Sequence, residues 1–379
     1  MARVEITRIW GPALGSPDRT ALSALARAGR AAFLLLTFAI AVLALGARAA
    51  APAQDKGVSG LAAPAADSPA QAAREDPPEP LVSLENLIAQ GQYQQAIPGL
   101  EQYLHDHDSS AKAHYDLGYA FFRTHQVGGA VRELSKSLQL NGQDAQAHKI
   151  LGLVCTFVGR YDLAETELEA AAKLEPDSPE IHYFLGRIYY TRQVFPMALK
   201  EFQTAIQLNP AYMKAYGNLG LVMEVLGKND EAVRDYTTAA QINETQHLKS
   251  PWPFEFLSAH YNRDREPGQA IEYAQRALQM DPKCDLAYYD LAKAYQAQSE
   301  WQKAIDAAQR AIAINSSTPE YFYLLSTALR RLGKVPESEA ALKRFEEIQN
   351  DQQATARIWR EASHQASAPQ APPQQDDEP

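Results

Sequence analysis

Three consecutive stretches of 34 residues between Ala111 and Tyr212 carry the same residues at the same places. Histidine, leucine and glycine recur with this period, as His114-Leu117-Gly118, His148-Leu151-Gly152 and His182-Leu185-Gly186. A fixed period of this size is typical of repeat arrays, in which each unit must stack on its neighbours to bury its apolar face. The period therefore constrains the fold more strongly than any other feature of the sequence.

The same register extends in both directions and defines eight units, which begin at Pro77, Ala111, Ala145, Pro179, Met213, Pro251, Asp285 and Pro319. Apolar residues at positions 4, 7, 8 and 11 of a unit share one face of a helix, and those at positions 20, 24, 27 and 28 share one face of a second helix. Small residues at positions 8, 20 and 27 let the two helices approach closely. Glycine at position 15 suits a left-handed turn, and proline at position 32 ends the second helix. Each unit is therefore predicted to be an antiparallel helical hairpin.

These units resemble the tetratricopeptide repeat family over about residues 77–350. Good instances of the family pattern are Tyr216-Leu219-Gly220 and Ala198-Phe202-Ala205-Pro210, whereas unit one lacks the Leu-Gly pair and three units carry His at position 4. The resemblance implies an all-α, right-handed superhelical solenoid of about eight helix-turn-helix repeats, over residues 81–350, with a concave groove lined by the first helices. Four extra residues, 247–250, precede unit six, and we expect a local break in the stacking there.

The last repeat needs a cap, because a terminal unit has no neighbour on one side. Residues 351–365 are predicted to form a C-terminal capping helix. Ala354, Ile358 and Ala362 lie four residues apart and are expected to face the array.

The amino-terminal segment, residues 1–49, is predicted to be a signal peptide or a membrane anchor. The apolar run from Ala31 to Leu45 follows several arginines and precedes the small-x-small site Ala47-Arg48-Ala49. This order is typical of a secretory signal, and the run is short for a membrane span, but the long segment before it leaves an uncleaved anchor open. Both alternatives predict a periplasmic or secreted protein, in the second case anchored to the inner membrane through residues 31–45 and facing the periplasm.

Two further segments have compositions that cannot bury enough apolar surface to fold. Residues 50–80 are predicted to be a disordered Ala/Pro-rich linker, and residues 366–379 a disordered acidic tail.

The composition argues against several functions. A net charge of −10 disfavours nucleic acid as the partner, because phosphate binding needs a basic face. Cys155 and Cys284 are three repeats apart and are expected to be too distant for a disulfide. No phosphate-binding loop, nucleophile elbow or metal-binding signature is present. We therefore expect no enzymatic activity, no cofactor and no metal.

The repeated histidines at position 4 could suggest a metal site. They belong to different repeats, however, and position 4 packs between helices, so we expect core histidines with one hydrogen bond each. His105 and His107, two residues apart near the end of unit one, could suggest a metal site as well, and a metal is disfavoured there too.

In the tetratricopeptide family, positions 2, 5, 9, 12 and 13 face the groove. In units two to four these positions hold aromatic and basic residues, which are common anchors of peptide interfaces: Tyr115, Tyr119, Phe122, Arg123, Lys149, Phe157, Tyr183, Arg187 and Tyr190. About half of the rings are expected to pack against adjacent helices. The groove is therefore predicted to bind a protein or peptide, with glycan binding in polysaccharide synthesis or export as the alternative.

The family's chaperone-binding carboxylate clamp can be compared position by position. Lys149 and Lys214 match it, whereas Leu153, Phe184 and Asn218 do not. A C-terminal carboxylate ligand of that type is therefore disfavoured.

Overall fold

The computed structural model describes residues 79–367, and for residues 79, 355, 356 and 358–367 it gives the helical backbone alone. The predicted signal peptide or anchor (1–49), nearly all of the predicted linker and most of the predicted acidic tail lie outside the described residues. Within residues 79–367 the chain consists of α-helices without a strand. In that range no helix combines the length and the hydrophobicity that a membrane-spanning segment needs.

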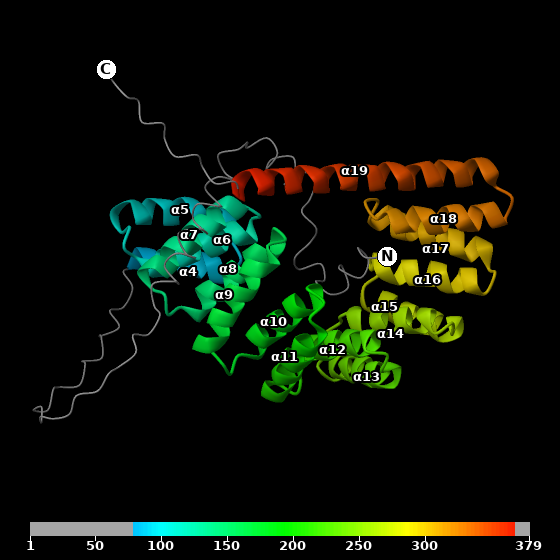
Figure 1. The fold of residues 1–379 in the computed structure, drawn as a ribbon, viewed down its shortest axis with the longest axis horizontal. Coiled ribbons are helices and arrows are strands. Elements are labelled where there is room, and N and C mark those ends of the chain that lie inside the picture. The colour runs from blue at the N-terminus through cyan, green and yellow to red at the C-terminus, as the bar shows by residue number, and fades with distance from the viewer. Residues whose placement is uncertain (1–78, 368–379) are drawn as a thin grey trace, which may run out of the picture. The chain divides into compact units, whose positions relative to one another are not determined.

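The described helices form eight consecutive hairpins, one for each predicted unit (Figure 1). This confirms the predicted all-α repeat solenoid. The helices are α4 (Glu79–Ala89), α5 (Tyr93–Asp106), α6 (Ala111–Arg123), α7 (Val127–Leu140), α8 (Ala145–Phe157), α9 (Tyr161–Leu174), α10 (Pro179–Thr191), α11 (Phe195–Leu208), α12 (Met213–Val225), α13 (Asn229–Thr245), α14 (Trp252–Arg263), α15 (Pro267–Met280), α16 (Asp285–Ala297), α17 (Trp301–Ile314), α18 (Pro319–Arg331) and α19 (Val335–Ser367).

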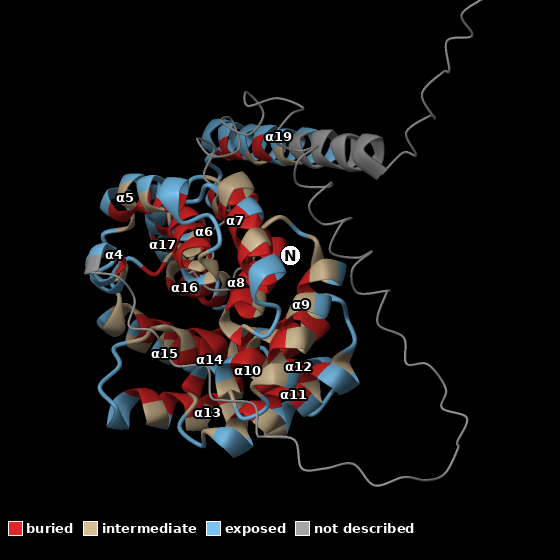
Figure 2. Ribbon diagram, turned by 90° about the vertical axis from the view of Figure 1, so that its left-hand side faces the viewer, coloured by how far each residue is buried: buried red, intermediate tan, exposed pale blue. Residues whose placement is uncertain are grey.

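The chain divides into two compact units, and the boundary between Cys155 and Thr156 falls inside α8. In each unit, helices pack against their own hairpin partner and against the neighbouring hairpin; α6, for example, contacts α5 and α7, and α16 contacts α15 and α17. Buried residues occupy the helix sides that face other helices, as Figure 2 shows. The core of each unit is therefore a row of interfaces between hairpins.

Close approach within a hairpin depends on glycine at position 8. A Cβ atom on Gly220 would lie 2.4 Å from the ring of Tyr236, and one on Gly186 would lie 2.6 Å from the ring of Phe202. Both rings are fully buried. The first helix therefore presents its bare backbone to an aromatic ring of the second helix.

The turn inside each hairpin has the left-handed conformation that glycine at position 15 predicts. Position 15 has a positive φ in all eight repeats, at Gly91, His125, Gly159, Gln193, Gly227, Arg265, Ser299 and Gly333. Four of these residues are not glycine and adopt φ near +60°, where the side chain carries a steric cost. The turn geometry is thus set by the hairpin and not by glycine alone.

The insertion before unit six lengthens a helix. α13 has 17 residues, and the buried side chain of Asn243 binds both backbone groups of Ser250 at 3.0 Å. His247 and Lys249, in the loop, both have φ +52°. Since α13 and α14 remain in contact, the stacking continues across the site where we expected a break.

The predicted capping helix is not a separate element. α19 runs without interruption from Val335 to Ser367, because no glycine or proline follows Pro336 in this stretch to end the helix. Gln352 still contacts the array, donating from Nε2 to the carbonyl oxygen of Ser317, in the loop between α17 and α18, at 3.0 Å. Ala354, which we expected to face the array, is exposed. The residues of the predicted cap therefore continue α19 and do not fold back.

Both cysteines are buried thiols and do not form a disulfide. Burial raises the pKa of the Cys284 thiol, which keeps this group protonated and unreactive.

Candidate functional site

The nine predicted groove residues lie on three first helices, α6, α8 and α10, and differ widely in exposure. Lys149, Tyr183 and Arg187 are buried, with 9%, 3% and 4% of their surface exposed. Arg123 is exposed, and the other five, Tyr115, Tyr119, Phe122, Phe157 and Tyr190, are half-buried. The structure gathers some of these residues, with others, into two clusters, one in each compact unit, which we call patch one and patch two.

Patch one consists of Tyr93, Lys112, Tyr115, Tyr119 and Arg123. The rings of Tyr115 and Tyr119, one turn apart on α6, are parallel within 2° with centroids 6.3 Å apart. Arg123, a further turn along, donates to the Tyr119 hydroxyl at 2.7 Å and lies 4.6 Å from the ring centroid of Tyr93. Tyr93, from α5, meets Tyr119 edge-on at 5.8 Å. Patch one is therefore a row of rings with an arginine at one end.

The lysine at the other end of patch one is held by carboxylates. Lys112 Nζ lies 2.6 Å from Asp116 Oδ1 and 3.2 Å from Glu85 Oε1, and 5.3 Å from the ring of Tyr115. Burial raises the pKa of Asp116, and the attraction of Lys112 opposes this shift. Since Lys112 is already paired, Arg123 is the cation of patch one that is best placed to meet an acidic ligand.

Patch two consists of Tyr183, Arg187, Lys214, Asn218 and Trp252, from α10, α12 and α14. Asn218 Nδ2 donates to the Tyr183 hydroxyl at 3.3 Å, and the Arg187 guanidinium lies 5.2 Å from the centroid of the Tyr183 ring. Lys214 Nζ lies 5.7 Å from the ring of Trp252. Together with Gly217 and Phe256, four of these residues line a small pocket, namely Tyr183, Lys214, Asn218 and Trp252.

Burial controls the charges of patch two. It lowers the pKa of Arg187, and burial together with the charge of Arg187 lowers the pKa of Lys214, which Glu180 partly offsets. Burial also raises the pKa of the Tyr183 hydroxyl, so this group stays neutral. An anion bound beside Lys214 would offset the repulsion that Arg187 exerts on the Lys214 charge.

Several predicted residues lie outside both patches: Phe122, Lys149, Phe157 and Tyr190. Conversely, Tyr93 and Trp252 were not predicted, and Lys214 and Asn218 were considered only as parts of the clamp. The sequence does contain a signal for Tyr93, which starts the second helix of unit one. The pair Trp301 and Arg331 has the same 30-residue spacing as Tyr93 and Arg123, and its guanidinium lies 5.7 Å from the indole ring. An aromatic residue at position 17 with arginine at position 13 of the next repeat therefore marks such a pair.

Two of the three position-4 histidines, His182 and His114, are braces between the helices of a hairpin. His182 Nδ1 lies 2.6 Å from Glu201 Oε2, and Nε2 lies 2.8 Å from the carbonyl oxygen of Pro176. His114 makes the equivalent contacts with Glu133 and the carbonyl oxygen of Asp108, at 2.7 and 3.0 Å. These rings thus make two polar contacts where we expected one.

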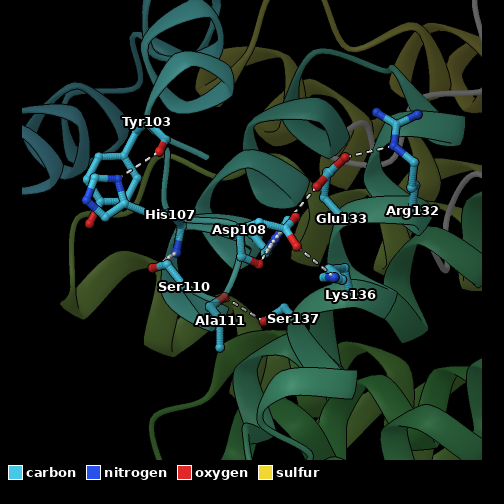
Figure 3. A network of polar contacts seen from close by, with 11 residues as sticks. Tyr103, His107, Asp108, Ser110, Ala111, Arg132, Glu133, Lys136 and Ser137 are labelled. Atoms are coloured by element: carbon cyan, nitrogen blue, oxygen red, sulfur yellow. Dashed lines mark hydrogen bonds and ion pairs between the residues drawn. The ribbon is translucent and has the colours of Figure 1, made fainter. Parts of the chain in front are cut away.

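Further polar groups surround the brace in unit two (Figure 3). Glu133 also accepts from Arg132 Nε at 2.8 Å, and Lys136 pairs with Asp108 at 3.1 Å. Ser137 Oγ donates to the carbonyl oxygen of Ala111 at 2.9 Å. Among the side chains that the structure describes, no group of three or more His, Cys, Asp or Glu is placed to hold a metal ion.

We expect the His182–Glu201 brace to make stability depend on pH. The hydrogen bond to Glu201 raises the pKa of His182, against burial and the nearby charge of Lys200. A raised pKa means that the brace contributes fully below the ordinary histidine pKa of about 6.5 and is lost as the pH rises through the raised value. Glu201→Gln should therefore lower the free energy of unfolding at pH 5.5, by no more than about 1 kcal/mol, and should lower it much less at pH 9. The loss should appear as a lower thermal midpoint at pH 5.5.

Thermal melts of the wild type and of Glu201→Gln across this pH range measure the effect. Glu101→Gln, at an exposed position of α5, is the control and should give a difference that does not change with pH. If the difference in thermal midpoint between Glu201→Gln and the wild type were also the same at every pH, the proposed role of the His182–Glu201 brace would be contradicted.

Three family models match successive parts of the chain. Two are described as "Tetratricopeptide repeat" and match residues 87–154 and 157–196, and the third, described as "Anaphase-promoting complex, cyclosome, subunit 3", matches residues 267–345. These matches fall on the helical hairpins described above. The chain is a tetratricopeptide repeat protein.

Solved structures share the tetratricopeptide fold. A chain of the APC/C hetero-tetramer Cut9-Hcn1 has a TM-score of 0.57 and 20% identity, with 66% of this chain and 49% of that chain covered. Yeast Tom70 has a TM-score of 0.55 and 14% identity, with 78% of this chain and 66% of the Tom70 chain covered. MamA 41-end from Desulfovibrio magneticus RS-1 has 21% identity and a TM-score of 0.42, with 44% of this chain and 94% of the MamA chain covered. The chain thus matches about half of the Cut9-Hcn1 chain and about two thirds of Tom70. No curated protein sequence matches.

Proposed function

We propose that this tetratricopeptide protein is a non-enzymatic scaffold that binds a peptide segment of a partner protein on the first helices of its repeats. The observation that carries the proposal is the pairing of aromatic rings with cations in patch one and patch two. Tyrosine, tryptophan and arginine dominate the energetics of protein interfaces. The similar fold of a chain in the APC/C hetero-tetramer Cut9-Hcn1 is in keeping with a role in protein assembly.

The partner segment should carry both apolar and acidic side chains. In patch one, Tyr115 and Tyr119 offer half-buried ring surface beside the exposed charge of Arg123. In patch two, considered by itself, Lys214 offers positive charge beside the ring of Trp252. Basic residues over aromatic rings suit a carboxylate that lies beside an aromatic or aliphatic side chain. We infer that such a segment is bound along its length and not by its C-terminal carboxylate.

Selection of a displayed peptide library on the purified protein tests the proposal. Recovered peptides should be enriched in acidic and aromatic residues, and Tyr119→Ala should weaken their binding by about 30-fold, the equivalent of about 2 kcal/mol for an aromatic anchor. Tyr103→Ala is the matched control, because Tyr103 is a half-buried tyrosine on a second helix, stacked on His107. Equal binding by the Tyr119 and Tyr103 variants would show that patch one is not the binding surface.

Glycan binding is the second candidate, since the parallel rings of Tyr115 and Tyr119 could also stack on a sugar. It predicts retention on a polysaccharide column and release by free sugar. Retention that Tyr119→Ala does not reduce would exclude a glycan site on these rings.

We also propose that the protein is exported and works in the periplasm or outside the cell, either cleaved or anchored. The support is the order of basic, apolar and small residues in the segment 19–49. An intact mass that starts at Ala50 would establish cleavage, whereas sedimentation with membranes would indicate an anchor. A full-length chain in the soluble cytoplasmic fraction would contradict export.

A further inference from the structure

The last hairpin leaves uncovered a position that is buried in every other repeat. The residue at position 24 is at most 1% exposed in units one to seven, as Leu100, Leu134, Leu168, Phe202, Tyr236, Ala274 and Ala308. Its counterpart in unit eight, Leu342, is 36% exposed. In unit five the next hairpin supplies part of the cover, because the ring of Tyr236 stacks on Phe256 of α14 at 5.4 Å. No further hairpin follows α19 among the described residues.

Two aromatic residues extend this uncovered surface. Position 27 is a buried alanine or serine in units two to seven, but in unit eight it is Phe345, which is half-buried. Tyr323 of α18 is 54% exposed, and its ring lies 5.6 Å from that of Phe345. Tyr323, Leu342 and Phe345 form what we call the end face. In unit five position 24 also contacts the next repeat, through Tyr236 and Phe256, so the end face includes a position that can pack on a following helix.

α19 also extends beyond its own hairpin. It has 33 residues, whereas its hairpin partner α18 has 13. Ile348 is 1% exposed, and Gln352 donates to Ser317 in the loop before α18, so α19 is held to the array as far as Gln352. The remaining stretch, residues 353–367, is about 22 Å long at 1.5 Å per residue. Most of the stability of a helix in a protein comes from packing of one of its faces on another element.

The end face and this extension share one side of α19. From Leu342 onward, a series of residues spaced alternately three and four apart runs along the helix, which is the spacing of the contact seam of a coiled coil. The series consists of Leu342, Phe345, Gln349, Gln352, Ala356, Trp359 and Ser363. It differs from the stripe Ala354, Ile358 and Ala362, which the sequence led us to expect against the array. A single helix packed along this seam would therefore cover both the end face and the extension.

We propose that two copies of the chain cap each other: the α19 extension of each copy packs on the end face of the other, with the two helices antiparallel around a two-fold axis. In this pairing Leu342 lies opposite Trp359 of the second copy. Phe345 lies opposite Ala356 of the second copy, so a large residue meets a small one. The arrangement is closed, because each copy gives one extension and receives one.

The polar residues of α19 agree with this register. Gln349 lies opposite Gln352 of the second copy, near the two-fold axis, where two amides can bond to each other. Along one edge of the seam, Glu339 lies beside Arg360 of the second copy, which pairs opposite charges. The pairing therefore brings no two like charges together at these positions.

A second copy fits the end face better than an unrelated helix for two reasons. First and second helices alternate in direction along the array, so an antiparallel α19 takes the place that the first helix of a ninth repeat would take. Leu342 and Phe345 of the end face also lie on the same helix as the extension, and a second α19 covers both at once along the seam from Leu342 to Ser363, about 33 Å. This inference is independent of the ligand that patch one and patch two bind.

Light scattering after size-exclusion chromatography tests the proposal on the full chain. The wild type should have twice the mass of one chain, and Leu342→Glu should have the mass of one chain. Lys343→Glu is the matched control, because it places the same side chain at the next, exposed residue of α19, outside the seam, and should remain a dimer. A monomeric wild type, or a dimeric Leu342→Glu, overturns the proposal.

A second pair of variants tests the extension without changing the hairpins. Trp359→Asp should give a monomer, because it places a charge in the seam, whereas Ile358→Asp, one residue away and outside the seam, should remain a dimer. A dimeric Trp359→Asp overturns the proposal even if Leu342→Glu unfolds.

Disulfide cross-linking tests the antiparallel arrangement. In the variant Phe345→Cys/Ala356→Cys the two new thiols lie about 16 Å apart on one helix, too far for a disulfide within a chain. Mild oxidation should therefore join two chains, and reduction should separate them, whereas Lys343→Cys/Ala356→Cys should stay uncoupled. Absence of the covalent dimer in the first variant overturns the proposed pairing.

Discussion

Replacing Gly220 with alanine is expected to lower the free energy of unfolding by about 3 kcal/mol, the upper end of the usual cost of overpacking. The new Cβ would lie 2.4 Å from Tyr236 Cε1 and 2.7 Å from Cδ1. The ring is fully buried and stacks on Phe256, so it cannot move away without disturbing the next hairpin. Urea and thermal unfolding followed by far-ultraviolet circular dichroism measure the loss, and hydrogen exchange should locate it in α12, α13 and α14.

Gly268→Ala is the matched control for this prediction. A Cβ at Gly268, in the first turn of α15, meets no atom within 4 Å, so alanine should be neutral or should stabilise by up to about 1 kcal/mol through its higher helix propensity. Unfolding of a repeat array is not strictly two-state, and shifts in midpoint are therefore the quantity to compare. If Gly220→Ala and Gly268→Ala lost similar amounts of stability, the effect of Gly220 would not come from close approach of the two helices at position 8.

The repeat period predicts the fold well because the determinants of a hairpin are local. Within one 34-residue unit the sequence contains the small residues that let helices approach and the residue that turns the chain. Even His125 and Ser299, which are not glycine, adopt the left-handed turn that the register assigns to them. Where the period ends, prediction becomes harder, because the length of α19 depends on the absence of a helix-breaking residue and on what its surface can contact.

The candidate site is less predictable, because the register gives a direction for each side chain and not its surroundings. Tyr115 and Tyr183 occupy the same position of their repeats, yet the first is half-buried and the second is 3% exposed. The difference comes from Phe202 and Tyr212, whose rings lie 6.1 and 5.3 Å from that of Tyr183. Such contacts depend on the sizes of residues that lie far apart in the sequence.

Phe202→Ala is expected to lower the free energy of unfolding by about 4 kcal/mol, within the range for a buried phenylalanine. Phe202 is fully buried, fills the space above Gly186 and supports the ring of Tyr183. Because Tyr183 belongs to patch two, the variant should also weaken any ligand bound there, while ligands of patch one remain bound as in the wild type. Denaturant unfolding and binding of the selected peptides, measured below the new midpoint, separate the two effects.

Phe195→Ala provides the comparison, since it is the same substitution on the same helix. Phe195 is half-buried at the start of α11 and meets the ring of Tyr190 edge-on at 5.6 Å, so its loss should cost about 1–2 kcal/mol, in proportion to the smaller apolar area it buries. Phe202→Leu should fall between the two, because leucine keeps much of the buried volume while removing the ring contact with Tyr183. If Phe202→Leu retained full stability but lost the peptide, the ring contact would matter for patch two alone. If Phe202→Ala and Phe195→Ala were equally destabilising, the packing of position 24 against position 8 would not be the main source of stability in the array.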